Sequence, residues 1–170
     1  MKSIGILVLV LILGIQTGNA QKQTARERKE QKAAEVKKLI GSGDYVFVAN
    51  SAQPMAFRRI NLTSNYELKM KGTSAEAWLP YFGRAYQADY GDTDGGIKFK
   101  EEAQGLKTSF NERKKSYEIQ FEVKTVKDNY TLYLSVGLSG YADLTVNSNN
   151  RQPISFTGMV EAPKADTEAK

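Results

Sequence analysis

The sequence predicts a mostly β protein in which an antiparallel meander closes into a barrel or a curled sheet, with one helix at the N-terminal side. Three observations carry this prediction. Apolar and polar residues alternate with a period of two over much of the chain, as in strands with one buried face. Short turns join these segments in succession. About eight such strands bury a single inner face best by curling, which also removes sheet edges. A two-sheet β-sandwich is the alternative, because periodicity does not separate the two architectures.

Residues 1–20 have the pattern of a secretory signal peptide. Lys2 supplies the positive charge, an apolar run from Ile4 to Ile15 follows, and small residues lie at 18–20. The run is too short for a membrane span, which needs about 20 residues. We therefore expect cleavage after Ala20, a periplasmic or secreted protein, and no membrane span afterwards.

Residues 21–41 are predicted to form a basic N-terminal helix. Thr24 and Glu27 have the spacing of a capping box, and Gly41 is a typical stop. The large apolar residues, Val36, Leu39 and Ile40, occur only in its second half. The second half should therefore dock on the body while the first half projects into solvent.

Residues 42–161 are predicted to form the β domain, and residues 162–170 a disordered tail. A first strand, over 45–49, is apolar enough to be buried on both faces. The other predicted strands lie at 66–70, 97–100, 106–110, 117–123, 132–138, 144–146 and 154–160. In the strand over 106–110, Leu106, Thr108 and Phe110 are expected to face the core. Turn residues at 104–105, 127–129 and 148–152 predict hairpin connections.

Composition excludes several classes of function. The chain has no cysteine and no histidine, which removes disulfides, thiolate and imidazole metal ligands, and Ser-His-Asp or Cys-His catalysis. Residues 22–38 hold seven basic and three acidic side chains; this excess of four, with Lys2, accounts for the whole net charge of +5. Acids and bases are balanced from Leu39 onward, which argues against a nucleic-acid-binding domain.

One segment, residues 78–90, is dense in aromatic side chains and contains the only tryptophan. Rings of this kind at a barrel mouth can bind sugars or peptides, with an arginine as polar handle. The alternative is a short helical turn that buries Trp78, Phe82 and Tyr86, four residues apart, in the core, with Pro80 in its first turn. The candidate ligand-binding residues are Trp78, Tyr81, Phe82, Arg84 and Tyr86.

The acidic end of the same segment invites a calcium interpretation, because Asp89, Asp92 and Asp94 precede two glycines. The spacing departs from an EF-hand loop, since the twelfth position from Asp92 is Ala103. Asp and Gly in this order are typical of a turn. We therefore predict turn chemistry here, with no metal site and no cofactor.

The strings LPYFGRAY at 79–86 and GGIKF at 95–99 resemble a known pattern, and so do the segments 133–136, 140–148 and 154–160. Together they resemble the domain of unknown function 4251 family of exported Bacteroidetes proteins, over roughly residues 30–161. The resemblance implies an exported, lipocalin-like β domain. It implies no activity and no catalytic residues.

These observations favour a non-enzymatic binding module for a small apolar or glycan ligand, or for a partner protein of the envelope. The ligand would bind at the aromatic segment. A second hypothesis is a structural or assembly factor of the cell envelope that contacts partners through the basic helix. A third, a hydrolase that uses paired carboxylates, lacks a candidate pair, because Glu101 and Glu102 are adjacent on a strand and face opposite sides.

Overall fold

The computed structural model describes residues 24–56, 58–86 and 95–164. They form a helix over residues 24–42 followed by nine strands. The strands are β1 (Asp44–Pro54), β2 (Ile60–Lys71), β3 (Ser74–Leu79), β4 (Ile97–Glu102), β5 (Gln104–Asn111), β6 (Ser116–Lys124), β7 (Asn129–Gly137), β8 (Tyr141–Ser148) and β9 (Ile154–Glu161). The predicted signal peptide and most of the predicted tail lie outside the described residues.

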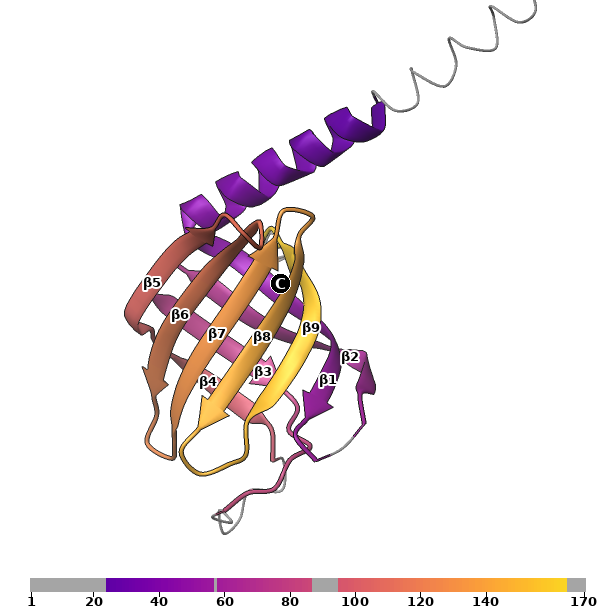
Figure 1. Cartoon of the computed structure of the whole chain (residues 1–170). Coiled ribbons are helices and arrows are strands. Elements are labelled where there is room, and N and C mark those ends of the chain that lie inside the picture. Colours follow the sequence, from indigo (N-terminus) through magenta and orange to yellow (C-terminus); the bar gives the residue numbers. More distant parts are fainter. Residues whose placement is uncertain (1–23, 57, 87–94, 165–170) are drawn as a thin grey trace, which may run out of the picture.

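All nine strands belong to one antiparallel sheet with the order β4-β3-β2-β1-β9-β8-β7-β6-β5. The sheet curls so that β5 to β9 form one layer and β1 to β4 cross behind it (Figure 1). The predicted meander is confirmed, as a sheet nearly closed into a barrel. The sandwich alternative does not hold, because β1 pairs with both β2 and β9 and so joins the two layers.

A bulge in β1 lies where the first and last strands meet. The register shifts between Ala49 and Ser51 against both neighbours. Opposite this bulge, Gly158 brings its Cα so close to β1 that a Cβ there would overlap the carbonyl oxygen of Val48. A bulge increases local twist, and a glycine allows close approach of two backbones. Together they let β1 bend from one layer into the other.

The opposite seam of the barrel, between β4 and β5, is open. These strands end the sheet order on either side, and the chain passes from one to the other through Ala103. The hairpin predicted at 104–105 is wrong: Gly105, with φ of +62°, lies within a second register shift, between Gln104 and Lys107. The Gly there bends the strand around a corner and does not reverse it. The turns predicted at 127–129 and 148–152 do fall between β6 and β7 and between β8 and β9.

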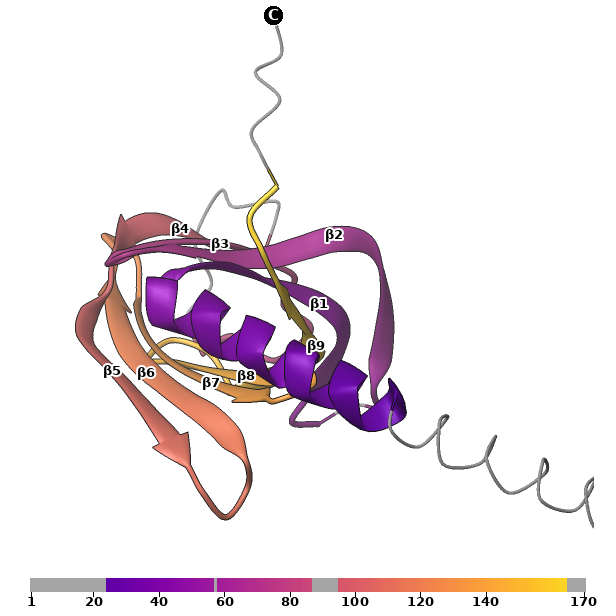
Figure 2. The same cartoon turned by 90° about the horizontal axis from the view of Figure 1, so that it is seen from above.

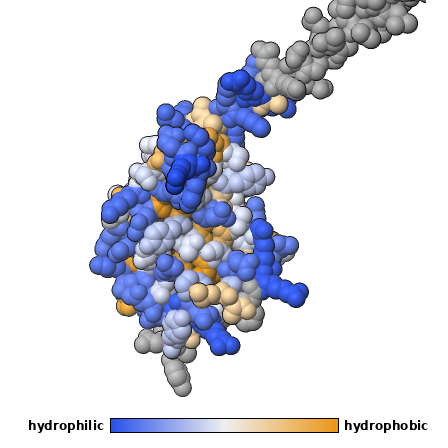
Figure 3. All heavy atoms as spheres, viewed as in Figure 1, coloured by the Kyte–Doolittle hydropathy of each residue, from blue (hydrophilic) through white to orange (hydrophobic). Residues whose placement is uncertain are grey.

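The core lies between the two layers and is filled by large side chains from both. In β6 to β9, apolar residues alternate with polar ones, and the apolar side of each strand lies in the core, as predicted. The largest fully buried side chains are Phe47, Phe121, Phe156, Leu68, Met70, Leu79, Ile97, Ile119, Leu132, Leu134, Leu144 and Ile154. The face of the molecule seen in Figure 3 is mostly hydrophilic, with apolar residues showing between polar ones.

The N-terminal helix covers one end of the barrel with its second half (Figure 2). Val36 and Ile40 are buried and belong to the core cluster, and Leu39 packs against it. Residues 24–31 are exposed, and this half of the helix extends away from the body (Figure 1). The structure thus has the predicted division of the helix. No helix among the described residues has the length and apolar character needed to cross a membrane.

The strand that the sequence did not predict is β3. Its burial alternates regularly, with Ala75, Ala77 and Leu79 inside and Glu76 and Trp78 outside. Two of the three inward residues are alanines, so its apolar period is carried by small side chains. The aromatic residues that follow it suggested a helical turn instead.

Candidate functional site

Trp78 lies on the outer face of β3, with 55% of its surface exposed. It is paired with Glu67 on β2 and Lys98 on β4. The ammonium of Lys98 lies 5.4 Å from the centroid of the indole, which is a cation–π distance. The lysine therefore covers part of one ring face, while more than half of the surface of Trp78 remains exposed to solvent.

Charged residues surround Trp78 on this outer face and pair with each other. Glu67 bonds Lys69 at 2.9 Å, and Glu76 bonds Lys100 at 3.3 Å. Exposed pairs of this kind contribute little to stability. On the outer face of β2, β3 and β4, these charged residues surround the indole, which is the one large apolar side chain on that face.

Residues 80–86 follow β3 and are held against the connection between β8 and β9. The amide of Tyr86 donates to the carbonyl of Asn150 at 2.7 Å, and the amide of Gln152 donates to the carbonyl of Arg84 at 3.1 Å. Between these two bonds, Ala85 and Arg151 form an isolated antiparallel bridge. This anchor fixes the path of the segment by backbone contacts, at the end of the barrel opposite the helix.

Tyr81 is the internal support of the segment. Its hydroxyl lies 2.8 Å from the carbonyl oxygen of Arg84 and 3.0 Å from that of Gln152, so one proton is shared between two acceptors. The guanidinium of Arg151 lies 5.2 Å from the ring centroid. Burial raises the pKa of the Tyr81 hydroxyl, and the positive charge of Arg151 opposes this rise. The hydroxyl thus remains a neutral donor at ordinary pH.

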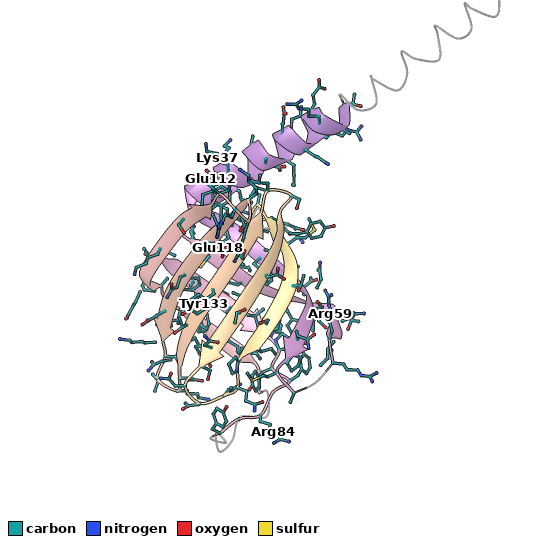
Figure 4. The ribbon with its side chains drawn as sticks, viewed as in Figure 1. Lys37, Arg59, Arg84, Glu112, Glu118 and Tyr133 are labelled. Carbon is teal, nitrogen blue, oxygen red and sulfur yellow. The ribbon has the colours of Figure 1, made fainter. Side chains whose placement is uncertain are left out.

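The other predicted site residues point outward. Phe82 is 36% exposed and Tyr86 65% exposed. Arg84 is exposed and reaches into solvent at the end of the molecule opposite the helix (Figure 4). The predicted helical turn is wrong, because residues 80–86 are not helical and Trp78, Phe82 and Tyr86 are not core residues. Pro80 ends the strand, since it has no amide to donate to a ladder.

Of the five candidate residues, Tyr81 supports the loop and the other four are presented to solvent. We call Trp78, Phe82, Arg84 and Tyr86 the aromatic face. Asp89, Asp92 and Asp94, together with Tyr90, lie outside the described residues. Within the described ranges, no three acidic side chains gather closely enough to hold a metal ion.

Sequence reasoning missed the residues that hold this end of the barrel together. Asp128 is buried in the turn after β6, where its carboxylate accepts bonds from the hydroxyl of Ser148 and, at 2.8 Å, from the amide of Asn129. Arg151 donates to the carbonyls of Gly95 and, at 3.4 Å, Gly96. The side-chain oxygen of Gln152 is buried and has no hydrogen-bond partner. The sequence predicted turns at 127–129 and 148–152, but it did not indicate that these two turns contact each other.

We expect Tyr81→Phe to lower the free energy of unfolding by about 1–2 kcal/mol, because the partly buried bond to the carbonyl of Gln152 is lost together with the exposed bond to the carbonyl of Arg84. Gly83→Ala should have a similar effect, since a Cβ at this position overlaps the Tyr81 ring. Thermal unfolding measures both. Tyr141→Phe is the matched control, because this ring is 63% exposed and should tolerate the same change. Equal stability of Tyr81→Phe and the control would show that the hydroxyl does not hold the loop.

The fold and the site define a class of protein: a nearly closed antiparallel β-barrel with a helix over one end and an aromatic loop at the other. The model of a family described as Domain of unknown function (DUF4251) matches residues 27–160, and the chain belongs to this family. A crystal structure of a DUF4251 family protein from Bacteroides eggerthii DSM 20697 is similar, with a TM-score of 0.59 and 15% identity over 77% of this chain and 87% of that chain. At this identity the likeness shows the fold alone. No curated protein matches the chain.

Proposed function

We propose that this protein is an exported, periplasmic or secreted, non-enzymatic binding module that docks a partner protein through the aromatic face. The observation that carries the proposal is the position of Trp78. The only tryptophan of the chain lies on the outer face of a strand, 55% exposed, and the loop that follows this strand carries two more exposed rings, Phe82 and Tyr86.

The composition of the aromatic face supports a protein partner. Tryptophan, tyrosine and arginine are the residues most enriched among those that dominate binding energy in protein interfaces. The aromatic face has one of each, together with Phe82. The matching surface would offer apolar side chains to the rings and a carboxylate to Arg84, because the guanidinium is exposed and forms bidentate bonds with carboxylates.

A protein partner fits better than the other two kinds of ligand considered. A small apolar ligand in the barrel would compete with the large side chains, such as Phe47, Phe121 and Phe156, that already fill its interior. A sugar that stacks on Trp78 would compete with Lys98 for the ring face. A partner polypeptide can keep Lys98 in place and pair with it.

The non-enzymatic part of the proposal rests on composition. Without histidine or cysteine, a catalytic site would depend on carboxylates, lysine or tyrosine. Neither Tyr81, whose proton is shared by two backbone carbonyls, nor Asp128, which is held by Ser148 and a backbone amide, is arranged as an acid or base facing a substrate. The exported location rests on the signal-peptide pattern of residues 1–20.

A second candidate function is favoured by the helix. Its first half, residues 24–31, contacts solvent along its whole length and holds Arg26, Arg28 and Lys29. An assembly role would use this half to contact an acidic surface of the envelope. The internal pair between Arg26 and Glu30, at 2.9 Å, neutralises part of the charge and weakens this candidate.

Site-specific photocrosslinking distinguishes the two. A photoreactive amino acid is placed at residue 78, at residue 28, or at Tyr133, an outward-facing position on β7 that is 42% exposed (Figure 4). In the cells that produce the protein, residue 78 should crosslink to one discrete polypeptide and residue 133 should not. Crosslinks from residue 28 alone would support the assembly role instead. Equal yields from residues 78 and 133 would contradict a specific aromatic face.

A further inference from the structure

The two most exposed large hydrophobic side chains of the described residues lie at the tips of two connections. They are Val126, at 106%, and Met55, at 72%. Val126 lies in the connection between β6 and β7, and Met55 directly follows Pro54, the last residue of β1. Neither belongs to the aromatic face. Single exposed apolar residues are common on protein surfaces, so the position that these two share is what matters.

The exposure of β5 has a different origin. Thr108 lies opposite the buried Ile119, on the inner side of the sheet. Nevertheless every residue of 104–110 is exposed, so the expectation that Leu106, Thr108 and Phe110 are core residues is wrong. The open seam beside β4 leaves this side of the strand uncovered. These residues mark the edge of the sheet and do not form a projecting tip.

The tips of Met55 and Val126 lie at the same end of the barrel, opposite the helix (Figure 1). β1 ends where Pro54 pairs with Ile154, at the start of β9. The connection that precedes β9 in turn contacts the connection between β6 and β7, because the side-chain amide of Asn150 donates to the carbonyl of Lys127 at 2.9 Å. The polar connection between β8 and β9 therefore separates the two apolar tips along the rim.

Hydrogen bonds hold the β6–β7 tip in an outward position. The amide of Thr125 donates to the carbonyl of Asp128 at 2.9 Å, and the hydroxyl of Thr125 accepts from the amide of Asp128 at the same distance. These bonds close the turn from both sides and leave Val126 and Lys127 at its apex. Val126 is thus presented to solvent by a braced turn.

The charge beside the two tips is positive. In the two connections, the described residues include three basic side chains, Arg58, Arg59 and Lys127, and one acidic side chain, Asp128. Asp128 is 7% exposed, and its carboxylate accepts hydrogen bonds within the protein. The aspartates within 87–94 belong to another connection and lie outside the described residues. The two tips therefore combine an apolar apex with basic neighbours.

We propose that this end of the barrel docks on a bilayer that contains anionic phospholipid. Met55 and Val126 insert among the headgroups, and the basic residues beside them lie near the lipid phosphates. A protein interface gathers its apolar anchors at its centre, whereas these tips are separated by a polar connection. A bilayer accepts separated tips, because it is a continuous surface. This inference goes beyond the proposed function and uses neither Trp78 nor residues 80–86.

Fluorescent labels at single positions test which residues contact lipid. The chain has no cysteine, so one introduced cysteine carries one polarity-sensitive fluorophore. The purified, exported protein is mixed with vesicles of equimolar phosphatidylglycerol and phosphatidylethanolamine. Labels on Val126→Cys and Met55→Cys should shift to shorter emission wavelengths, whereas labels on Tyr133→Cys and Arg28→Cys should not. A shift at Arg28→Cys alone would assign the contact to the helix and overturn the proposal.

Co-sedimentation with the same vesicles measures binding. Val126→Glu should weaken binding about tenfold, because an apolar tip becomes a carboxylate, and Arg58→Gln about fivefold. Tyr133→Glu, the same charge on the side of the barrel, is the matched control and should bind like the wild-type protein, as measured on an exposed position. Vesicles of phosphatidylcholine alone should bind the protein much less.

Two results would overturn the proposal. One is equal binding of Val126→Glu and Tyr133→Glu. The other is no binding of the wild-type protein to the anionic vesicles together with crosslinks from residue 126 to a polypeptide, which would assign the tips to a protein partner. Neither result bears on the proposed function, which is tested by crosslinks from residue 78.

Discussion

Gly158→Ala is expected to lower the free energy of unfolding by about 3 kcal/mol, the upper end of the range for forced overpacking. The new Cβ would overlap the carbonyl oxygen of Val48 and crowd the Cα of Ala49, and both atoms belong to the backbone. A side chain could rotate away from the new Cβ, but backbone atoms can avoid it only if the two strands move apart. The strands that would separate are β1 and β9, whose pairing joins the two layers of the sheet.

The loss should appear as a fall of roughly 6–12 °C in the midpoint of thermal unfolding. Gly137→Ala is the matched control. It is also a glycine in a strand, but its nearest neighbour to a new Cβ is the carbonyl oxygen of Tyr141 at 3.5 Å, an ordinary contact. This control should be neutral or slightly stabilising. If the two variants unfold at the same temperature, the close approach of β1 and β9 does not depend on Gly158.

A second large effect should appear at alkaline pH, because of Tyr45. This residue is 3% exposed, and burial raises the pKa of its hydroxyl from 10.0 to about 12. Between these values the unfolded chain has released the proton and the folded protein has kept it. The unfolded state then binds fewer protons, so the free energy of unfolding falls as the pH rises. The contribution is fully present below pH 10 and is lost by about pH 12, a total of about 3 kcal/mol.

Tyr45→Phe should remove this alkaline loss, because phenylalanine has no proton to release. The measurement is the midpoint of chemical unfolding at a series of pH values from 8 to about 12. Tyr141→Phe, a change in a ring that is 63% exposed, should leave the wild-type profile in place. A Tyr45→Phe profile that overlays that of Tyr141→Phe would mean that the Tyr45 hydroxyl is not desolvated in the folded state.

The barrel could be predicted from the sequence wherever side chains of different size and polarity alternate. In β6 to β9, large apolar residues such as Phe121 and Leu134 alternate with polar ones, and each strand was placed correctly. In β3 the inward residues Ala75 and Ala77 are small, so the alternation of apolar and polar residues in the sequence was too weak to predict a strand. In β5 the alternation of residues predicted the strand but not its exposure. Alternation indicates which side of the sheet a residue faces, and does not indicate whether another layer covers that side.

The site could be predicted in part, for a related reason. The aromatic density of residues 78–86 located the segment, but it did not separate Tyr81, which supports the loop, from Trp78, which faces solvent. That separation depends on the connection 149–153, whose backbone and Arg151 meet the segment from the other side of the barrel end. Such a meeting depends on how the sheet curls, and residue patterns along one segment do not encode it.

The proposed function requires that a partner polypeptide covers Trp78 where the protein works. Hydroxyl-radical footprinting tests it most directly, because Trp78 is the only tryptophan and its oxidation is read from a single peptide. Tyr141, on β8, is the internal reference, since it is similarly exposed at 63%. In the purified protein both residues should be oxidised. In the intact cells that produce the protein, oxidation of Trp78 should be reduced relative to that of Tyr141. If Trp78 is oxidised in cells to the same extent as in the purified protein, no partner covers it and the proposed function is contradicted.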